Sequence, residues 1–305
     1  MNKSIAQIKE EFERAGEQER KELYEVYAGD VRLGVLALIE KYRKKDKALA
    51  AERRRLAQMR RFEEEYSGYR LICGVDEAGR GPLAGPVVAG AVILPPDCEI
   101  LYLNDSKKLS PGKRETLYSE IMEKAAAVGI GMVGPARIDE INILNATYEA
   151  MRRAVADLGV QPDILLNDAV TIPEISVPQV PVIKGDAKSV SIAAASIIAK
   201  VTRDRLMLQY DEVLPGYGFA RHKGYGSEEH IAAIRKLGPT PCASTPPPRP
   251  TGRGWSRAGP PCSPIWRARS TGRSSRCRWP WRARPAGMSA SRRRSRFPPP
   301  CSGLV

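Results

Sequence analysis

Two adjacent acidic residues, Asp76 and Glu77, stand between a short apolar run and a turn rich in glycine. Residues 71–75 (LICGV) predict a buried strand, and carboxylates at the end of such a strand point into a cleft. Two negative charges so close together repel each other unless a proton or a cation lies between them. Carboxylate oxygens are ligands that Mg²⁺ and Mn²⁺ prefer, so the pair is a candidate metal site. A solvated turn is the alternative, and this segment alone does not decide between them.

The glycine-rich turn also fits a different motif. Residues 79–84 (GRGPLA) match the GxGxxA pattern of dinucleotide-binding proteins, and Glu99 follows about twenty residues later, as that pattern expects. The motif requires a helix directly after its glycines. Here residues 86–94 are rich in valine and alanine and predict a strand, and Pro82 and Pro86 interrupt the turn. The context therefore argues against a nicotinamide cofactor.

Three further motifs follow the first in order along the chain. They are DSKKLS at residues 105–110, KGDAKS at 184–189 running into the small-residue stretch 192–204, and PGYGF at 215–219 followed by HKGYG at 222–226. In order and spacing, the four motifs resemble the ribonuclease HII family over residues 1–241. The turn GRG after the Asp-Glu pair is similar to HII and differs from the ribonuclease HIII branch. The N-terminal region resembles the helical extension of Gram-positive members.

This resemblance implies a fold and a metal site. The fold is α/β, a ribonuclease H-like mixed sheet flanked by helices. The catalytic and metal-binding carboxylates would be Asp76, Glu77, Asp168 and Asp186, with Mn²⁺ or Mg²⁺ as the cofactor and Asp76 as a ligand shared by two ions. Asp168 and Asp186 each follow a short predicted strand. Taken alone, Asp168 would be interpreted as a turn residue and Asp186 as a residue at the start of a helix.

The resemblance also implies an activity and a set of substrate contacts. Family members are endonucleases that hydrolyse the RNA strand of RNA/DNA hybrids and cut on the 5′ side of single ribonucleotides in duplex DNA, as in ribonucleotide excision repair. A two-metal mechanism that leaves a 3′-hydroxyl and a 5′-phosphate is implied. The implied substrate contacts are Gly79, Arg80 and Gly81 at the ribose 2′-hydroxyl, Lys107 and Lys108 at phosphates, and Tyr225 against the sugar where RNA passes into DNA.

Alternating helices and strands must position these residues. The predicted helices cover residues 4–61, as two or three segments, then 115–128, 138–158 and 189–213, the last capped by Ser189 or Ser191. The predicted strands are residues 71–75, 86–94, 129–133, 163–167 and 180–183. His222 and His230 are left out of the predicted site because a metal-ion mechanism does not require a histidine.

Charge is unevenly distributed along the 305 residues. Residues 242–305 hold 14 of the 49 basic side chains and none of the 35 acidic ones, so residues 1–241 carry 35 of each sign. The net charge of +14 therefore belongs to the C-terminal segment. Within the neutral part, residues 41–61 hold ten basic residues against two acidic ones, which predicts either a nucleic-acid-facing surface or a solvated helix face.

The C-terminal segment differs in composition from everything before it. It contains all four tryptophans and 12 of the 25 prolines, with no helical or alternating apolar period, which predicts disorder. Family members usually continue after a GPTP segment, residues 238–241 here, with a His-Arg pair and a phenylalanine, whereas this chain continues with CASTPPP. We therefore hypothesise a frameshift near codon 242. The alternative is a nucleic-acid-binding arm whose tryptophans stack on bases.

The chain is thus expected to have three parts: a helical N-terminal extension (1–68), a ribonuclease H-like catalytic domain (69–241) and the disordered segment (242–305). Cys73 and Cys98, the two cysteines before residue 242, form no CxxC pair, which indicates neither a zinc site nor a disulfide framework. No apolar run approaches about 18 residues, so a cytoplasmic protein without a membrane segment is expected. The protein is also expected to be a monomer. The functional alternative is a non-catalytic module that binds RNA/DNA hybrids, which would predict substitution among the four acids, and none is substituted.

Overall fold

The computed structural model describes residues 3–240. The predictions for residues 242–305, disorder and a shifted reading frame, lie outside the described residues.

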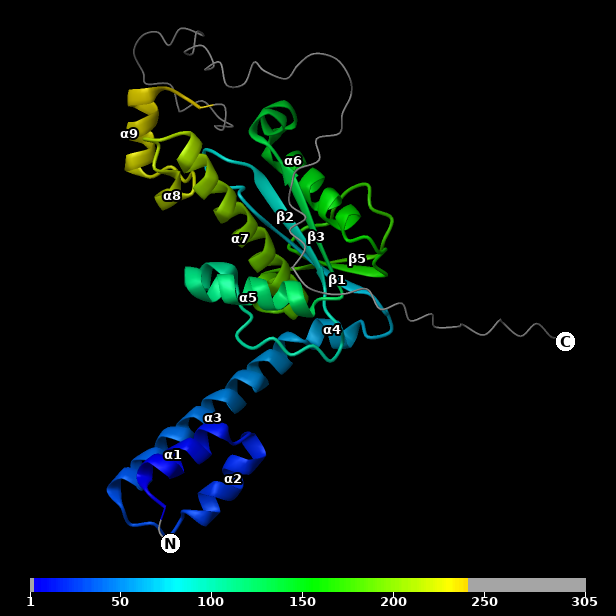
Figure 1. The fold of residues 1–305 in the computed structure, drawn as a ribbon. Helices are drawn as coiled ribbons and strands as arrows, with labels where there is room; N and C mark the ends of the chain where they lie inside the picture. The colour runs from blue at the N-terminus through cyan, green and yellow to red at the C-terminus, as the bar shows by residue number, and fades with distance from the viewer. Residues whose placement is uncertain (1–2, 241–305) are drawn as a thin grey trace, which may run out of the picture. The chain divides into compact units, whose positions relative to one another are not determined.

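A five-stranded mixed sheet forms the centre of the described chain. Its strands are β1 (Ile72–Ala78), β2 (Val87–Ile93), β3 (Ala127–Val133), β4 (Ile164–Asp168) and β5 (Gln179–Val182), in the spatial order β3-β2-β1-β4-β5 (Figure 1). β1 pairs antiparallel with β2 and parallel with β4, and β4 pairs parallel with β5. The predicted α/β fold with a mixed sheet is confirmed, and the run of residues 71–75 does lead into a buried central strand.

Two long helices cover the two faces of this sheet (Figure 1). One face of β1 and β2 packs against α6 (Pro135–Asp157) through a core that includes Val75, Ala91 and Met151. The other face packs against α7 (Val190–Val213) through a core that includes Val92 and Ile197. Both cores are closely packed because small residues line the contacts. β1 is therefore held from both sides, which fixes the strand that carries Asp76.

Glycines on β1 and β2 let α7 approach the sheet closely. A Cβ at Gly90 would lie 2.5 Å from the carbonyl oxygen of Ala195, and one at Gly74 would overlap the backbone of Ser191. Side chains two residues apart on a strand share a face, so Asp76 lies on the same face as Gly74, toward α7. The Ser189 hydroxyl accepts a hydrogen bond from the Ile192 amide and caps α7, which decides between the two predicted caps.

Four helices precede the sheet, where the sequence predicted two or three. They are α1 (Ile5–Arg14), α2 (Glu17–Val26), α3 (Leu33–Met59) and α4 (Arg61–Glu65). Phe12 packs against the rings of Tyr24, Tyr27 and Tyr42, with centroids 5.0 to 6.2 Å apart, and anchors α1 and α2 on α3. Among residues 3–240, no helix is both long enough and apolar enough to cross a membrane.

One predicted helix is displaced. The sequence predicts a helix over residues 115–128, but α5 spans Pro111–Lys124. The Ser110 hydroxyl caps the helix by accepting a hydrogen bond from the Lys113 amide, and proline occupies the first turn. Val128 instead pairs with Val92 in the ladder between β2 and β3. Strand pairing therefore overrides the helix propensity of the alanines at residues 125–127.

Two short helices near residue 240 are absent from the prediction. They are α8 (Phe219–His222) and α9 (Glu228–Leu237), and the 3-10 turns η1 (Ser106–Lys108) and η2 (Gly185–Ala187) were also not predicted. α9 buries only His230 and Ile234, so its apolar pattern is narrow. The Ser227 cap and the acidic first turn are the signals that could have identified α9.

Candidate active site

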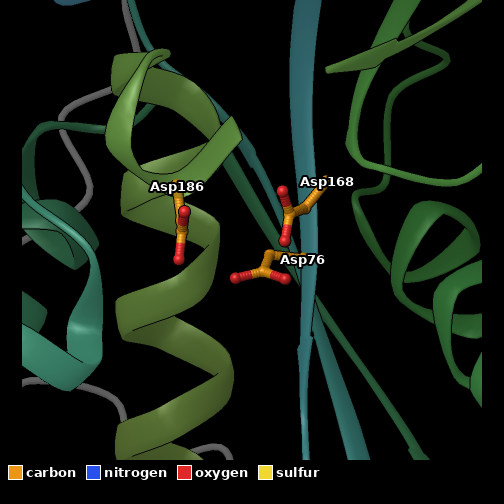
Figure 2. Close-up of side chains that lie close together, drawn as sticks. All are labelled: Asp76, Asp168 and Asp186. Carbon is orange, nitrogen blue, oxygen red and sulfur yellow. The ribbon is translucent and has the colours of Figure 1, made fainter. Parts of the chain in front are cut away.

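Three aspartates from three separate segments converge beside the start of α7. One carboxylate oxygen from each of Asp76, Asp168 and Asp186 lies within 4.8 Å of the other two (Figure 2). Asp76 is on β1 and Asp168 ends β4, and the parallel register pairs the residues just before them, Val75 with Asn167. Asp186 lies in η2, between β5 and α7. Neighbouring parallel strands therefore bring the first two together, and the turn into α7 adds the third.

Hydrogen bonds from the backbone fix these carboxylates. Asp76 Oδ1 accepts from the amide of Glu77 at 2.7 Å, and Asp168 Oδ1 accepts from the amide of Gly185 at 2.7 Å. A Cβ at Gly185 would lie 2.5 Å from Ile192 Cδ1 and 3.3 Å from Asp168 Oδ1, so the turn approaches both side chains closely at this position. Asp76 and Asp186 are 6% and 8% exposed. The cluster is thus largely withdrawn from water and pre-positioned.

Burial and mutual repulsion both raise the pKa values of the Asp76 and Asp186 carboxyl groups. Burial raises the pKa of Asp76 well above its ordinary value, and the charges of Glu77 and Asp168 raise it further. Burial also raises the pKa of Asp186, reinforced by Asp105 and Asp168. Without a cation, the Asp76 and Asp186 carboxyl groups therefore bind protons more readily than exposed aspartates do. A site built from several close carboxylate oxygens, which are hard ligands, behaves in this way when its cation is absent. The residues fit a divalent metal ion.

Glu77 stands beside this group rather than in it. The three-aspartate group does not include Glu77, whose side chain is 13% exposed and accepts a hydrogen bond from Arg80 Nη1 at 3.1 Å. Burial raises the pKa of Glu77, although Arg80 opposes the change. Of the four predicted metal ligands, the structure brings three together and places the fourth next to Asp76, paired with a predicted substrate residue.

The two predicted phosphate-binding lysines differ in surroundings. Burial lowers the pKa of Lys107, but the charges of Asp105, Asp76 and Asp186 outweigh it and the pKa is raised. Lys107 therefore belongs to the electrostatic environment of the aspartates. Lys108 instead lines a cavity of about 580 Å³ that Lys188 also lines.

Two polar residues at the site were not predicted. Asp105 Oδ1 accepts a hydrogen bond from the Lys107 amide, and the charge of Asp105 contributes to the raised pKa of Asp186. The hydroxyl oxygens of Ser196 on α7 and Ser106 lie 2.8 Å apart, and Ser196 lowers the pKa of Asp76, which partly offsets the effect of burial. Both residues lie in the motifs that resemble the family, but only the folded chain shows that they face the aspartates.

The glycine-rich turn and Tyr225, which are far apart in sequence, lie in contact. A Cβ on Gly81 would lie 3.5 Å from Tyr225 Cε1, and Tyr225 is 48% exposed. The Leu83 and Ala84 amides both donate to the carbonyl oxygen of Gly224, at 2.9 and 3.2 Å. The two predicted substrate elements therefore form one surface.

The dinucleotide alternative fails on its structural requirement. The turn is followed by the strand β2, not by a helix, and β2 pairs along its whole length with β3. The two histidines also lie apart from the three aspartates. His222 and His230 stack on each other with ring centroids 4.5 Å apart, and Phe219 packs edge-on against both rings.

Comparisons with known proteins agree with this architecture. The family models "Ribonuclease HII N-terminal domain" and "Ribonuclease HII" match residues 4–67 and 73–247. Ribonuclease HII of Lachnoclostridium phytofermentans is 62% identical over 241 residues, which cover 79% of this chain and 95% of that protein. Ribonuclease HII of Enterococcus faecalis is 54% identical over 214 residues, covering 70% and 84%.

A solved structure shares the fold. The structure of the PCNA:RNase HII complex from Archaeoglobus fulgidus contains a chain that is 27% identical, with a TM-score of 0.50, and the match covers 60% of this chain and 98% of that one. With a family model that spans more than half of the chain and relatives above 50% identity, the chain belongs to the ribonuclease HII family of ribonuclease H enzymes.

Proposed function

We propose that this protein hydrolyses the RNA strand of RNA/DNA hybrids and cuts duplex DNA on the 5′ side of a single embedded ribonucleotide. The observation that carries the proposal is the convergence of Asp76, Asp168 and Asp186, with carboxylate oxygens within 4.8 Å of one another, in a member of the ribonuclease HII family. The products would be a 3′-hydroxyl and a 5′-phosphate. A monomer in the cytoplasm stays a prediction.

Asp76, Glu77, Asp168 and Asp186 are the proposed holders of Mn²⁺ or Mg²⁺. Such ions, when bound, would lower the pKa of the attacking water and stabilise charge on the leaving oxygen. Asp76 is buried and close to both other aspartates, which suits a ligand shared between two ions. The backbone hydrogen bonds to Asp76 and Asp168 hold the oxygens in place before any ion arrives, which reduces reorganisation during the reaction.

The basic residues around the cluster suit a phosphate backbone. The charges of the aspartates raise the pKa of Lys107, and its ammonium group would hold a non-bridging oxygen of the scissile phosphate. Lys108 would contact a phosphate further along the strand.

Selection of RNA requires a group that senses the 2′-hydroxyl, since this group distinguishes a ribonucleotide from its DNA neighbours. We assign this role to the backbone of Gly79, Arg80 and Gly81, where Gly79 has φ of +108°, a conformation that favours glycine. The exposed ring of Tyr225, in contact with Gly81, would stack on the sugar at the junction between RNA and DNA. The two contacts together would allow the protein to recognise a ribonucleotide that is followed by DNA.

The direct test is cleavage of a labelled DNA duplex that contains one ribonucleotide, with Mn²⁺ or Mg²⁺ and with EDTA. The chain is compared with Asp76→Asn and with the control Asp97→Asn, which changes an exposed aspartate after β2. We expect metal-dependent cutting 5′ of the ribonucleotide by the wild type and the control. Asp76→Asn should lose at least about 1000-fold in rate, since a ligand of the reaction centre is removed.

The alternative, a non-catalytic module that binds RNA/DNA hybrids, predicts a different outcome. Such a module would bind the duplex with the same affinity in wild type and Asp76→Asn and would cut under no metal condition. A folded wild-type chain that binds but does not cut would therefore overturn the proposal.

A further inference from the structure

Arg203 on α7 is a buried cation without a carboxylate partner. Its side chain is 1% exposed, and none of the ion pairs within residues 3–240 involves it. Burial lowers the pKa of Arg203. Removing a guanidinium from water is costly unless its donors are well satisfied, so the acceptors around Arg203 account for its burial.

The guanidinium joins the two segments that carry the proposed substrate contacts. Arg203 Nε donates to the Pro86 carbonyl oxygen at 3.0 Å, and Nη2 donates to that of Ala84 at 3.0 Å. Nη1 donates to the carbonyl oxygen of Lys223 at 2.9 Å. The first two acceptors end the glycine-rich turn, and the third precedes Tyr225 by two residues. One planar group therefore joins the turn to the segment before the tyrosine, in addition to the hydrogen bonds from the Leu83 and Ala84 amides to the Gly224 carbonyl oxygen.

The glycines of the turn make room for this guanidinium. A Cβ at Gly79 would lie 2.6 Å from Arg203 Nε, and a Cβ at Gly85 would lie 3.0 Å from Nη2. The turn therefore lies directly over the arginine. Glycine at these positions has a structural reason that is independent of any contact with a ribose.

The segment before Tyr225 is held in a strained conformation. Lys223 has φ of +51° and Gly224 has φ of +85°, and a non-glycine residue with positive φ persists only where its surroundings impose it. Arg203 supplies that restraint at the Lys223 carbonyl. On the other side, Gly224 donates to His222 Nδ1 at 3.1 Å and the Tyr225 carbonyl lies 2.9 Å from His230 Nδ1.

We propose that Arg203 is a positioning residue that fixes the ribose-contacting turn and Tyr225 at one spacing, and thereby sets selectivity for a ribonucleotide that is followed by DNA. The inference rests on the proposed function, because it assumes that both segments contact substrate. A long RNA/DNA hybrid has no such junction inside it, so its cleavage depends less on this spacing.

The test compares cleavage of a single-ribonucleotide duplex with cleavage of a long RNA/DNA hybrid, for the wild type, Arg203→Lys and the control Arg205→Lys. Lysine keeps the charge but cannot reach both segments at once. The control changes a half-exposed arginine two positions away that pairs with Glu115. For Arg203→Lys we expect KM on the single-ribonucleotide duplex to rise about 10- to 100-fold, because small displacements of positioning groups have effects of that size. The ratio of kcat/KM between the two substrates should fall by at least about tenfold, with the Kd for Mn²⁺ and the rate on the hybrid nearly unchanged.

If the ratio of kcat/KM between the two substrates stays unchanged in Arg203→Lys, whether or not both activities fall, Arg203 does not set selectivity for the single ribonucleotide. If Arg203→Lys does not fold, as judged by circular dichroism, Gly224→Ala replaces it. A Cβ there would strain the left-handed backbone and overlap the Ala84 carbonyl without removing a buried charge, and the same fall in the ratio is expected. A wild type that cuts neither substrate would instead refute the proposed function itself.

Discussion

Asp168 holds the turn that carries Asp186. Its Oδ1 accepts the Gly185 amide at 2.7 Å, so the carboxylate at the end of β4 fixes the backbone directly before a second carboxylate of the same cluster. Lys184, the residue before this turn, has φ of +58°, a conformation that costs energy in a lysine. Asp168 therefore has two roles: it contributes a negative charge to the cluster, and its hydrogen bond to the Gly185 amide positions the turn that carries Asp186.

Two substitutions should separate these two roles. In Asp168→Asn the amide oxygen can still accept the Gly185 amide, and a charge that repels Asp76 and Asp186 is removed, so in EDTA this variant should be at least as stable as the wild type while its Mn²⁺ affinity falls. In Asp168→Ala the part-buried amide loses its partner, and we expect an additional loss of about 1–3 kcal/mol in stability. Urea denaturation in EDTA and titration calorimetry with Mn²⁺ measure the two effects. Equal stability of the two variants would show that the hydrogen bond from the Gly185 amide to residue 168 does not stabilise the fold.

Asp76 should destabilise the metal-free protein at neutral pH. Its folded-state pKa is raised by burial and by Glu77 and Asp168, so its contribution to stability is present below the pKa of the unfolded chain and is lost as pH rises through the folded pKa. Asparagine remains neutral and keeps an oxygen for the Glu77 amide. We expect Asp76→Asn to be more stable than the wild type by about 0.5–2 kcal/mol in EDTA at pH 7.

The difference for Asp76→Asn should shrink near pH 4, where the wild-type carboxyl group is increasingly protonated. It should reverse at saturating Mn²⁺, since an ion that binds only the folded wild type stabilises it. Thermal unfolding at these two pH values, with EDTA or Mn²⁺, gives the comparison. A variant that is less stable than the wild type in EDTA at pH 7 would show that repulsion among the carboxylates is not the dominant effect.

The aspartates of the site could be predicted from the sequence, but the residues that position the surrounding segments could not. Asp76 ends an apolar run, and the motifs that resemble the family point to Asp168 and Asp186, so sequence reasoning reached all three. Arg203 lies in one of these motifs but inside a helix, where an arginine usually indicates a solvated face. Only the packing of α7 under the glycine-rich turn buries it against the carbonyl oxygens of Ala84 and Pro86. Contacts between segments this far apart leave no local pattern.

His230 should make the protein less stable in mild acid. His230 is 1% exposed, and burial lowers its pKa, with His222 lowering it further. A histidine whose folded pKa is below that of the unfolded chain stabilises the protein above about pH 6.5, and this stability is lost as pH falls toward the folded pKa.

His230→Asn is the variant that tests this contribution. Asparagine can donate to the Tyr225 carbonyl but does not titrate, so the free energy of unfolding should fall less between pH 7 and pH 5 than in the wild type. The expected difference is on the order of 1 kcal/mol. Urea denaturation across this range measures it, and parallel curves for the two proteins would assign the pH dependence to other groups.

Residues 242–305 should be dispensable for the proposed activity. Every residue that we assign to metal or substrate lies before this segment, and residues 1–241 carry equal numbers of basic and acidic side chains. A chain that ends at residue 241 should cut the single-ribonucleotide duplex with kcat and KM within about twofold of the full chain, as expected if the segment is out of frame and does not touch the substrate. If its 14 arginines instead bind the substrate, truncation should raise KM. The plot of log KM against log salt concentration should then become shallower by about 0.9 for each phosphate that the shortened chain no longer neutralises. Cleavage assays from low to moderate salt distinguish a segment that does not touch the substrate from one that binds it. Resequencing the gene around codon 242 tests the frameshift independently.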